Sequence, residues 1–180
     1  MFDKILIANR GEIAVRVIKT CRRMGIKTVV VYSDADAGSL ACEMADETVH
    51  IGPSPAAQSY LIQDKIVDAV KQTGAQAVHP GFGFLSENAS FARRLKAEGI
   101  AFIGPNPEAI DAMGDKITSK KFAAEAGVST VPGHMGLIET PDEAVKIARE
   151  IGYPVMIKAS AGGGGKGIRV AHSDDDMAEG

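Results

Sequence analysis

The sequence feature that most constrains the fold is a run of glycines between two short apolar segments late in the chain. Residues 162–165 are all glycine, and Lys166 and Gly167 follow them. The flanking residues, 154–159 and 168–171, are rich in the aliphatic and β-branched types that favour strands. Each glycine costs roughly 1 kcal/mol relative to alanine in regular structure, because it loses more conformational freedom on folding. We therefore predict a strand–loop–strand hairpin whose backbone approaches a ligand closely.

Two lysines next to these glycines indicate what the ligand is. Lys158 ends the first apolar segment, and Lys166 lies within the loop. Successive N–H groups of a glycine-rich backbone can surround an anion, and two ammonium groups would balance the charge of a triphosphate. A flexible linker is the alternative, but linkers usually lack flanking strands and paired lysines.

The residues around the loop distinguish between known phosphate-binding motifs. A Walker A motif fails, because Ser160 stands at its first glycine position and Gly167 follows the lysine. Gly162, Gly164 and Gly167 match G-x-G-x-x-G, but a dinucleotide fingerprint opens a helix and here a strand follows. A strand–loop–strand cover over phosphates is the arrangement of kinases and ATP-grasp enzymes. We expect a flap that closes over ATP and excludes water.

The first hundred residues alternate between apolar strands and amphipathic helices. We predict strands at 4–8, 27–32, 48–51, 77–79 and 100–103, and helices at 12–24, 60–72 and 86–97. Continuous apolar strands joined by helices favour a parallel sheet covered on both faces. The alternation stops near Met113, where we place a domain boundary. The fold class is therefore α/β, with a Rossmann-like parallel sheet followed by a glycine-rich β-hairpin.

Two places in this sheet leave alternatives open. Asp34 and Asp36 follow the second strand, where a Rossmann enzyme binds ribose, yet the first turn lacks the glycine fingerprint, so both can be ordinary loop residues. The stretch 79–88, HPGFGFLSEN, is either a strand-to-helix turn with Ser86 as N-cap or a ligand loop at the carboxyl end of a parallel strand.

Five motifs, in the same order as in a known family, are distributed over nearly the whole length of the chain. They are KILIANRGEI (4–13), HPGFGFLSEN (79–88), FIGP (102–105), MGDK (113–116) and KASAGGGGKG (158–167). On these motifs the chain resembles the N-terminal portion of a biotin carboxylase, an ATP-grasp enzyme, and is most similar to α subunits of propionyl-CoA and acetyl-CoA carboxylases. The resemblance implies a Rossmann-like pre-ATP-grasp domain over residues 1–113 and an incomplete ATP-grasp lid subdomain over residues 114–180.

The resemblance implies an ATP-dependent ligase. Such enzymes use MgATP and bicarbonate to carboxylate biotin on a carrier protein through carboxyphosphate, the first half-reaction of an acyl-CoA carboxylase, here for propionyl-CoA. The implied partners are a biotin carboxyl carrier domain, a carboxyltransferase β subunit and a second copy of the enzyme. The implied compartment is the bacterial cytoplasm, or the mitochondrial matrix for a processed eukaryotic homologue.

The resemblance also assigns site residues. It implies ATP binding by Lys116, Lys158, Gly163, Gly164, Gly165, Lys166 and Gly167, and places His79, Phe82 and Glu87 near the active site. Phe82 stands where many members carry tyrosine. The catalytic residues and the Mg²⁺ ligands of the family lie downstream of these residues, so we expect none in this chain and no activity from it alone.

Composition narrows the possible functions. The 180 residues carry a net charge of −3 with no basic block for nucleic acid, and no run of 18 apolar residues that would span a membrane. Cys21 and Cys42 are expected to be reduced thiols. Two alternative functions remain. Another ATP-grasp carbon–nitrogen ligase would share the hairpin but not the motifs at 9–13 and 79–88, and a nucleotide-binding module would lack chemistry of its own.

Overall fold

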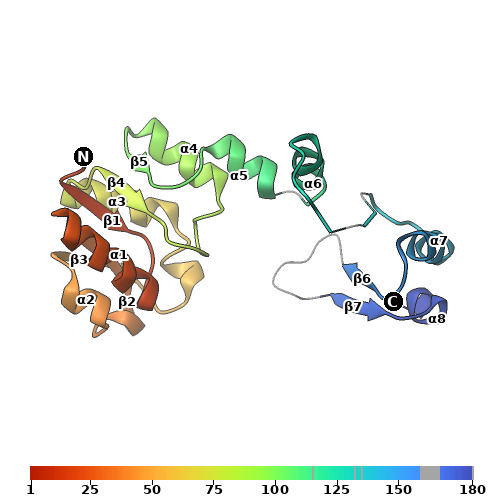
Figure 1. Ribbon diagram of the computed structural model, residues 1–180. Helices are drawn as coiled ribbons and strands as arrows, with labels where there is room; N and C mark the ends of the chain where they lie inside the picture. Colours follow the sequence, from red (N-terminus) through yellow and green to blue (C-terminus); the bar gives the residue numbers. More distant parts are fainter. Residues whose placement is uncertain (115, 132, 135, 159–166, 180) are drawn as a thin grey trace. The chain divides into compact units, whose positions relative to one another are not determined.

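The structure is a computed structural model of the chain, and it describes residues 1–114, 116–131, 133–134, 136–158 and 167–179. It divides into two compact units, Met1–Gly114 and Asp115–Gly180. Each unit is described by itself, and Figure 1 shows the elements of both.

The first unit is built on a sheet of five parallel strands. These are β1 (Lys4–Ile7), β2 (Lys27–Ser33), β3 (Glu47–Gly52), β4 (Ala77–His79) and β5 (Ala101–Phe102). Their order is β3-β2-β1-β4-β5, so β1 lies in the middle and pairs in parallel with both β2 and β4. The chain runs outward to β3 on one side and then crosses to β4 on the other. The predicted Rossmann-like parallel sheet is confirmed.

Helices cover both faces of this sheet (Figure 1). Helices α1 (Gly11–Met24) and α2 (Leu40–Met44) pack on one face, where Ile18 and Ala41 join Ile7 and Val30. Helices α3 (Gln63–Thr73) and α4 (Ala89–Ala97) pack on the other, against a core that contains Leu6. Helix α5 (Pro107–Gly114) and the 3₁₀ turns η1 (Asp34–Asp36) and η2 (Ala56–Gln58) complete the unit. Because both faces are buried, the middle residues of the two central strands, 5–7 of β1 and 29–31 of β2, are all apolar.

Two helices begin later than the sequence pattern predicts. Helix α3 starts at Gln63 rather than at Tyr60, because Tyr60 is buried in contacts with other parts of the chain. Helix α4 starts after Asn88, whose side chain accepts a 2.9 Å hydrogen bond from Phe91 N and is the N-cap. The prediction of Ser86 as N-cap is wrong, because Ser86 N donates to Gly83 O within the preceding turn.

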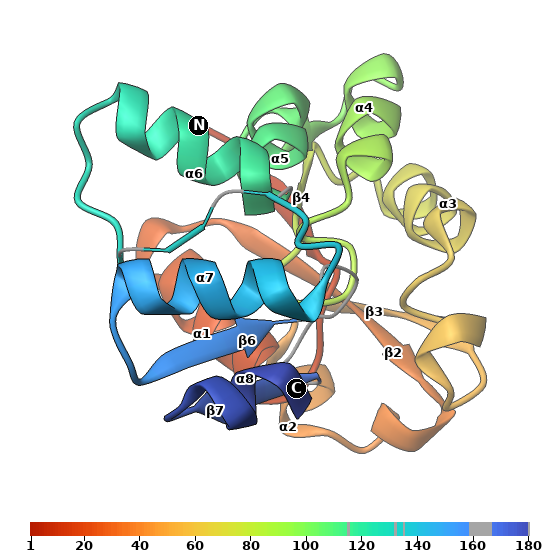
Figure 2. The ribbon, with the colours of Figure 1, turned by 90° about the vertical axis from the view of Figure 1, so that its right-hand side faces the viewer.

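The second unit contains the hairpin and three helices. The helices are α6 (Lys116–Glu125), α7 (Pro141–Ile151) and α8 (Asp174–Glu179), and the strands are β6 (Val155–Lys158) and β7 (Ile168–Ala171). The strands pair antiparallel with Lys158 opposite Ile168, which confirms the predicted hairpin. Helix α7 runs beside β6 in Figure 2. It packs against the hairpin through Ala144 and Ala148, which lie in one core with Ala171 and Met177.

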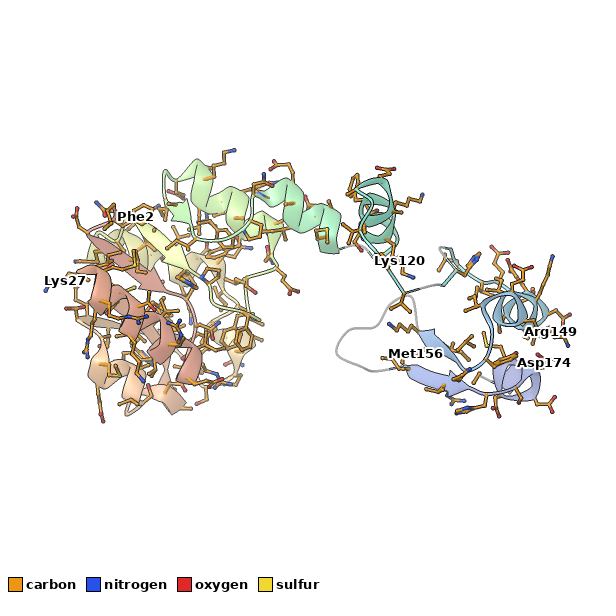
Figure 3. The ribbon with its side chains drawn as sticks, viewed as in Figure 1. Phe2, Lys27, Lys120, Arg149, Met156 and Asp174 are labelled. Carbon is orange, nitrogen blue, oxygen red and sulfur yellow. The ribbon has the colours of Figure 1, made fainter. Side chains whose placement is uncertain are left out.

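A polar contact ties α7 to α8 in this second unit. Arg149 of α7 forms a salt bridge with Asp174 of α8, and Figure 3 shows the two side chains close to each other. Tyr153 Oη donates to the other carboxylate oxygen of Asp174 at 2.8 Å. Since Tyr153 lies two residues before the start of β6, this contact fixes where the hairpin begins.

Candidate functional site

In the first unit, the order of strands reverses at β1: the chain adds β2 and β3 on one side of β1 and then β4 and β5 on the other. Helix α1 after β1 and helix α4 after β4 pack on opposite faces of the sheet, and the carboxyl ends of two such strands are where open α/β sheets bind ligands. The segments that follow these strands are residues 8–11 after β1 and residues 79–88 after β4. Both match motifs singled out from the sequence.

Asn9 joins these two segments. Its side chain is buried at 1% exposure, and Nδ2 donates to Pro80 O at 2.7 Å and to Phe82 O at 2.9 Å. Its Oδ1 accepts from Arg10 N at 2.9 Å. A buried amide with every hydrogen-bonding group satisfied holds its partners in one geometry. Asn9 therefore fastens the loop after β4 to the end of β1.

The loop after β4 turns sharply through three residues in the left-handed region. The φ angles are +65° at Gly81, +69° at Gly83 and +42° at Phe84. A Cβ atom on Gly81 would lie 2.6 Å from Ile13 Cγ2 and 2.7 Å from Asn9 Nδ2, so no side chain fits there. Phe84 is the single non-glycine residue with positive φ in the described part of the chain. This conformation costs a bulky residue about 1 kcal/mol or more.

A cluster of four side chains offsets that cost, and we call it the Tyr60 cluster: Arg10, Asp36, Tyr60 and Phe84. The rings of Tyr60 and Phe84 stack with centroids 4.9 Å apart and planes within 1°. The Arg10 guanidinium carbon lies 5.7 Å from the Phe84 centroid and 5.9 Å from that of Tyr60. Aromatic pairs contribute roughly 0.5–1.5 kcal/mol beyond area burial, and cation–π contacts about 0.5–1 kcal/mol. These gains are comparable with the backbone strain at Phe84.

Asp36 anchors this cluster to the end of β2. Its Oδ2 accepts hydrogen bonds of 2.7 Å from Ser33 Oγ and from Tyr60 Oη, and lies 3.8 Å from Arg10 Nη1. Burial of the phenol, together with its bond to Asp36, raises the pKa of Tyr60 well above its ordinary value. The carboxylate that would bind ribose in a dinucleotide enzyme is therefore engaged by the chain itself. Asp34 pairs instead with His50 Nε2 at 2.6 Å.

Sequence reasoning missed the Tyr60 cluster. The apolar pattern placed Tyr60 on the following helix, whereas its partners lie 24 residues before and 24 residues after it, at Asp36 and Phe84. The available signal was a tyrosine outside the apolar stripe of α3. A buried tyrosine usually finds a partner for its hydroxyl.

The three predicted residues of the first unit all lie on the loop after β4. His79 ends β4 and is half-buried, and its Nδ1 accepts from Gly81 N at 3.1 Å, so the proton of the neutral ring is on Nε2. Phe82 is 69% exposed, and Glu87 is exposed at the other end of the loop, before Asn88. Asn9 thus holds the backbone at Pro80 and Phe82, directly after His79, while Glu87 lies five residues beyond Phe82.

The pH dependence of stability should reveal the environment of His79. Burial lowers the pKa of His79 below its ordinary value near 6.5, so protonation favours the unfolded chain. The contribution of neutral His79 to the free energy of unfolding is fully present above pH 6.5 and is lost as the pH falls below that value. We expect the free energy of unfolding of the parent to drop more steeply between pH 7.5 and 5.0 than that of His79→Asn. Urea unfolding at several pH values measures both slopes, and equal slopes would contradict this prediction.

The second unit presents one face of the hairpin away from α7, and we call it the outer hairpin face: Met156, Lys158, Ile168 and Val170. Side chains alternate along β6, so Val155 and Ile157 join the core with α7. The three apolar members of the outer hairpin face are Met156, Ile168 and Val170, exposed by 57%, 41% and 51%. Met156 is labelled in Figure 3. Lys158 ends β6 on this same face and is exposed.

The remaining predicted ATP-binding residues are placed only in part. Gly167 directly precedes β7 and has a φ of +70°, a conformation that favours glycine. Lys116 begins α6, but its side chain lies outside the described structure. Gly163, Gly164, Gly165 and Lys166 also lie outside the described residues.

The described residues contain neither a candidate metal cluster nor a candidate membrane-spanning helix. Within those ranges, no three His, Cys, Asp or Glu side chains gather in a way that could hold a metal ion. No helix among the same residues has the length and apolar character needed to cross a membrane.

Family models match both units. The model described as "Biotin carboxylase, N-terminal domain" matches residues 1–110, and that described as "Carbamoyl-phosphate synthase L chain, ATP binding domain" matches residues 115–180. The propionyl-CoA carboxylase α chain of Ruegeria pomeroyi is 69% identical over 180 residues, which are 100% of this chain and 26% of that protein. Biotin carboxylase 1 of Bacillus subtilis is 53% identical over 180 residues, 100% of this chain and 40% of that protein.

Solved structures agree with these matches. The complex of biotin carboxylase with β-γ-ATP from Campylobacter jejuni has a TM-score of 0.91 and 44% identity, covering 99% of this chain and 40% of that one. The biotin carboxylase domain of Hydrogenobacter thermophilus 2-oxoglutarate carboxylase, solved with MgADP, ADP and bicarbonate, has a TM-score of 0.88 and 49% identity, covering 99% and 39%.

A parallel Rossmann-like sheet followed by a glycine-rich antiparallel hairpin, with these matches, defines a protein of the ATP-grasp class. Within that class, the chain belongs to the biotin carboxylase family, as its sequence motifs predicted. It spans about a quarter of the length of the propionyl-CoA carboxylase α chains that it matches.

Proposed function

We propose that this chain is the N-terminal and ATP-lid part of a biotin carboxylase. The whole enzyme would use MgATP and bicarbonate to carboxylate biotin on a carrier protein through carboxyphosphate. This is the first half-reaction of an acyl-CoA carboxylase, with propionyl-CoA as the proposed acceptor. The observation that carries the proposal is the hairpin, where a lysine and a glycine-rich connection adjoin an exposed apolar face.

The outer hairpin face fits a nucleotide. Met156 and Ile168 offer an apolar surface of the kind on which a purine ring packs, and Lys158 lies beside them at the end of β6. A base on the apolar side chains would leave its phosphates toward Lys158 and the glycine connection. We infer that Lys158, with Lys116, Lys166 and the backbone at 163–167, holds the phosphates. Such cations stabilise the charge that develops when a phosphoryl group is transferred.

The loop after β4 would contribute to a part of the active site other than the phosphate-binding hairpin. We infer that His79, Phe82 and Glu87 lie near the active site of the whole enzyme. Support comes from their loop position at the carboxyl edge of a parallel sheet, where open α/β sheets bind ligands. Asn9 would keep this loop in place when substrates bind. The catalytic residues and the Mg²⁺ ligands would be supplied by other segments of the enzyme.

The proposed partners follow from the same reaction. They are a biotin carboxyl carrier domain, a carboxyltransferase β subunit, and a second copy of the enzyme in a homodimer. The matched relatives include bacterial and mitochondrial proteins, so we propose the bacterial cytoplasm or the mitochondrial matrix as the compartment. Another ATP-grasp ligase is the second candidate, because residues 115–180 match the carbamoyl-phosphate synthase model.

Phosphate release from MgATP tests the function directly. We would measure biotin- and bicarbonate-dependent release with this 180-residue chain and with the protein extended to the length of its relatives. We expect activity in the extended protein alone, because the proposal places the catalytic groups beyond residue 180.

Each other result has a definite meaning. Activity in the 180-residue chain would show that catalytic groups lie within it and that the site assignment is wrong. A folded extended protein with no biotin-dependent release would exclude the proposed reaction. The same protein would then be assayed with ammonia and bicarbonate, substrates of a carbamoyl-phosphate-forming ligase.

A further inference from the structure

The stack between Phe84 and Tyr60 is the contact that holds the most unusual backbone in the molecule. Phe84 has a φ of +42°, which a phenylalanine rarely adopts, and its ring lies parallel to that of Tyr60 at 4.9 Å. Tyr60 is 1% exposed and belongs to the hydrophobic core, and Phe84 packs against this core. Strained residues persist where surrounding contacts over-determine them, and such places are often functional.

Tyr60 is itself fixed by the end of β2. Its hydroxyl accepts a 3.1 Å hydrogen bond from Ser33 N and donates one of 2.7 Å to Asp36 Oδ2. Ser33 is fully buried, so its N–H has no access to water as a substitute partner. The ring of Tyr60 is therefore held at its polar end as well as on its face, and it cannot turn away from Phe84 without leaving these groups unpaired.

Phe82 lies between two anchored points of the same loop. On one side, Asn9 Nδ2 binds the carbonyls of Pro80 and Phe82. On the other side, Phe84 is stacked on Tyr60, and Ser86 N closes the turn by donating to Gly83 O at 2.9 Å. The side chain of Phe82 is nevertheless 69% exposed. The loop is thus rigidly held while it presents an aromatic ring to solvent.

We propose that Tyr60 is a positioning residue, whose ring keeps Phe84 in the left-handed conformation and thereby fixes the exposed ring of Phe82 for the substrate that it contacts. The proposal rests on the function proposed above, in which Phe82 lies near the active site of the whole enzyme. Because the residues proposed to hold the ATP phosphates belong to the second unit, biotin is the substrate that we assign to this loop. Tyr60 touches no substrate in this arrangement. It acts through Phe84, by determining the direction in which the loop leaves the sheet.

Steady-state kinetics of the extended protein separate positioning from general stability. We expect Tyr60→Leu to raise the KM for free biotin about tenfold and to leave the KM for ATP within twofold, because the hairpin belongs to the other unit. Tyr60→Phe keeps the ring and should restore the KM for biotin to within twofold of the parent. Tyr32→Phe removes a phenol that is not part of the Tyr60 cluster, and should change neither KM. Should Tyr60→Leu not fold, Phe84→Leu removes the same stack from the other side.

Other kinetic results would contradict either the positioning role or the proposed function. An unchanged KM for biotin in Tyr60→Leu, a fall in kcat alone, or an equal rise in both KM values would overturn the positioning role. Absence of biotin-dependent release in the parent would instead reject the proposed function.

Amide exchange in the 180-residue chain tests the loop independently of any activity. The Ser86 amide, hydrogen-bonded across Phe84 to Gly83 O, is the reporter. We expect its exchange to be at least tenfold faster in Tyr60→Leu than in the parent, and within twofold of the parent in Tyr60→Phe. Equal exchange in the parent and in Tyr60→Leu would show that the stack does not hold the loop.

Discussion

Replacing Lys158 by alanine in the extended protein should lower biotin-dependent phosphate release from MgATP about 100-fold. Removing one group that stabilises developing charge in a water-excluded site typically costs a factor of about 10²–10³ in turnover. Lys158 is exposed at the end of β6 and forms no salt bridge with any residue that the structure describes. Its loss should therefore leave the fold of the unit intact, with a Tm within about 2 °C of the parent.

Two further variants sharpen this result. Lys146→Ala removes an exposed lysine from α7 in the same unit and should leave phosphate release within twofold. Lys158→Arg keeps the charge but not the compact ammonium group, so an intermediate rate is expected. If Lys158→Ala retains the parental rate while the protein is folded, the phosphate-binding role of this lysine is wrong.

Replacing Gly81 by alanine should cost about 3 kcal/mol of stability, three times the effect of the same change at Gly83. Both glycines have nearly the same φ, +65° and +69°, so both variants bear the left-handed penalty of about 1 kcal/mol. At Gly81 the new methyl group also meets Ile13 Cγ2 and Asn9 Nδ2 at 2.6 and 2.7 Å, whereas at Gly83 it meets nothing within 4 Å. Overpacking of this kind adds roughly 1–3 kcal/mol.

Thermal unfolding of the two variants measures this difference. For a unit of this size, 1 kcal/mol corresponds to a Tm change of about 4 °C, so we expect losses of about 12 °C for Gly81→Ala and about 4 °C for Gly83→Ala. The near-ultraviolet signal reports the first unit for the larger part, because Tyr32 and Tyr60 lie in it and the third tyrosine, Tyr153, lies in the second unit. Equal Tm values would mean that the loop can move away from Asn9 with no loss of stability. That result would contradict the role of Asn9 in holding this loop at the end of β1.

The sequence predicted the elements of both units because their determinants are local. The continuous apolar strands have no solvated face, and Gly25 and Gly74 end helices α1 and α3 with φ angles of +72° and +68°. Thr140 is the N-cap of α7, with its side chain accepting from Glu143 N at 3.3 Å. These signals act within one or two helical turns and so can be read from adjacent residues.

The details of the candidate site depend on contacts between distant residues. The helix start at Gln63 instead of Tyr60 follows from a stack with Phe84 and a bond to Asp36, neither of which has a periodic signature. The start of α4 at Ala89 likewise follows from the tight turn that Gly83 makes. The motif at 79–88 showed where the loop lies, but not that Asn9 holds it from a different strand.

The central place of β1 in the sheet has a consequence for synthesis on the ribosome. Its first partner, β2, follows within about thirty residues, whereas its second partner, β4, begins at Ala77. At a synthesis rate of about 5–20 residues per second, the edge of β1 that pairs with β4 remains unpaired for roughly 3–15 seconds. The side chain of Asn9 lacks its hydrogen-bond partners for about the same time, because the carbonyls that it binds lie 71 and 73 residues later in the sequence. During this interval the nascent chain carries an unpaired strand edge, whose free N–H and C=O groups are a template for pairing with another chain.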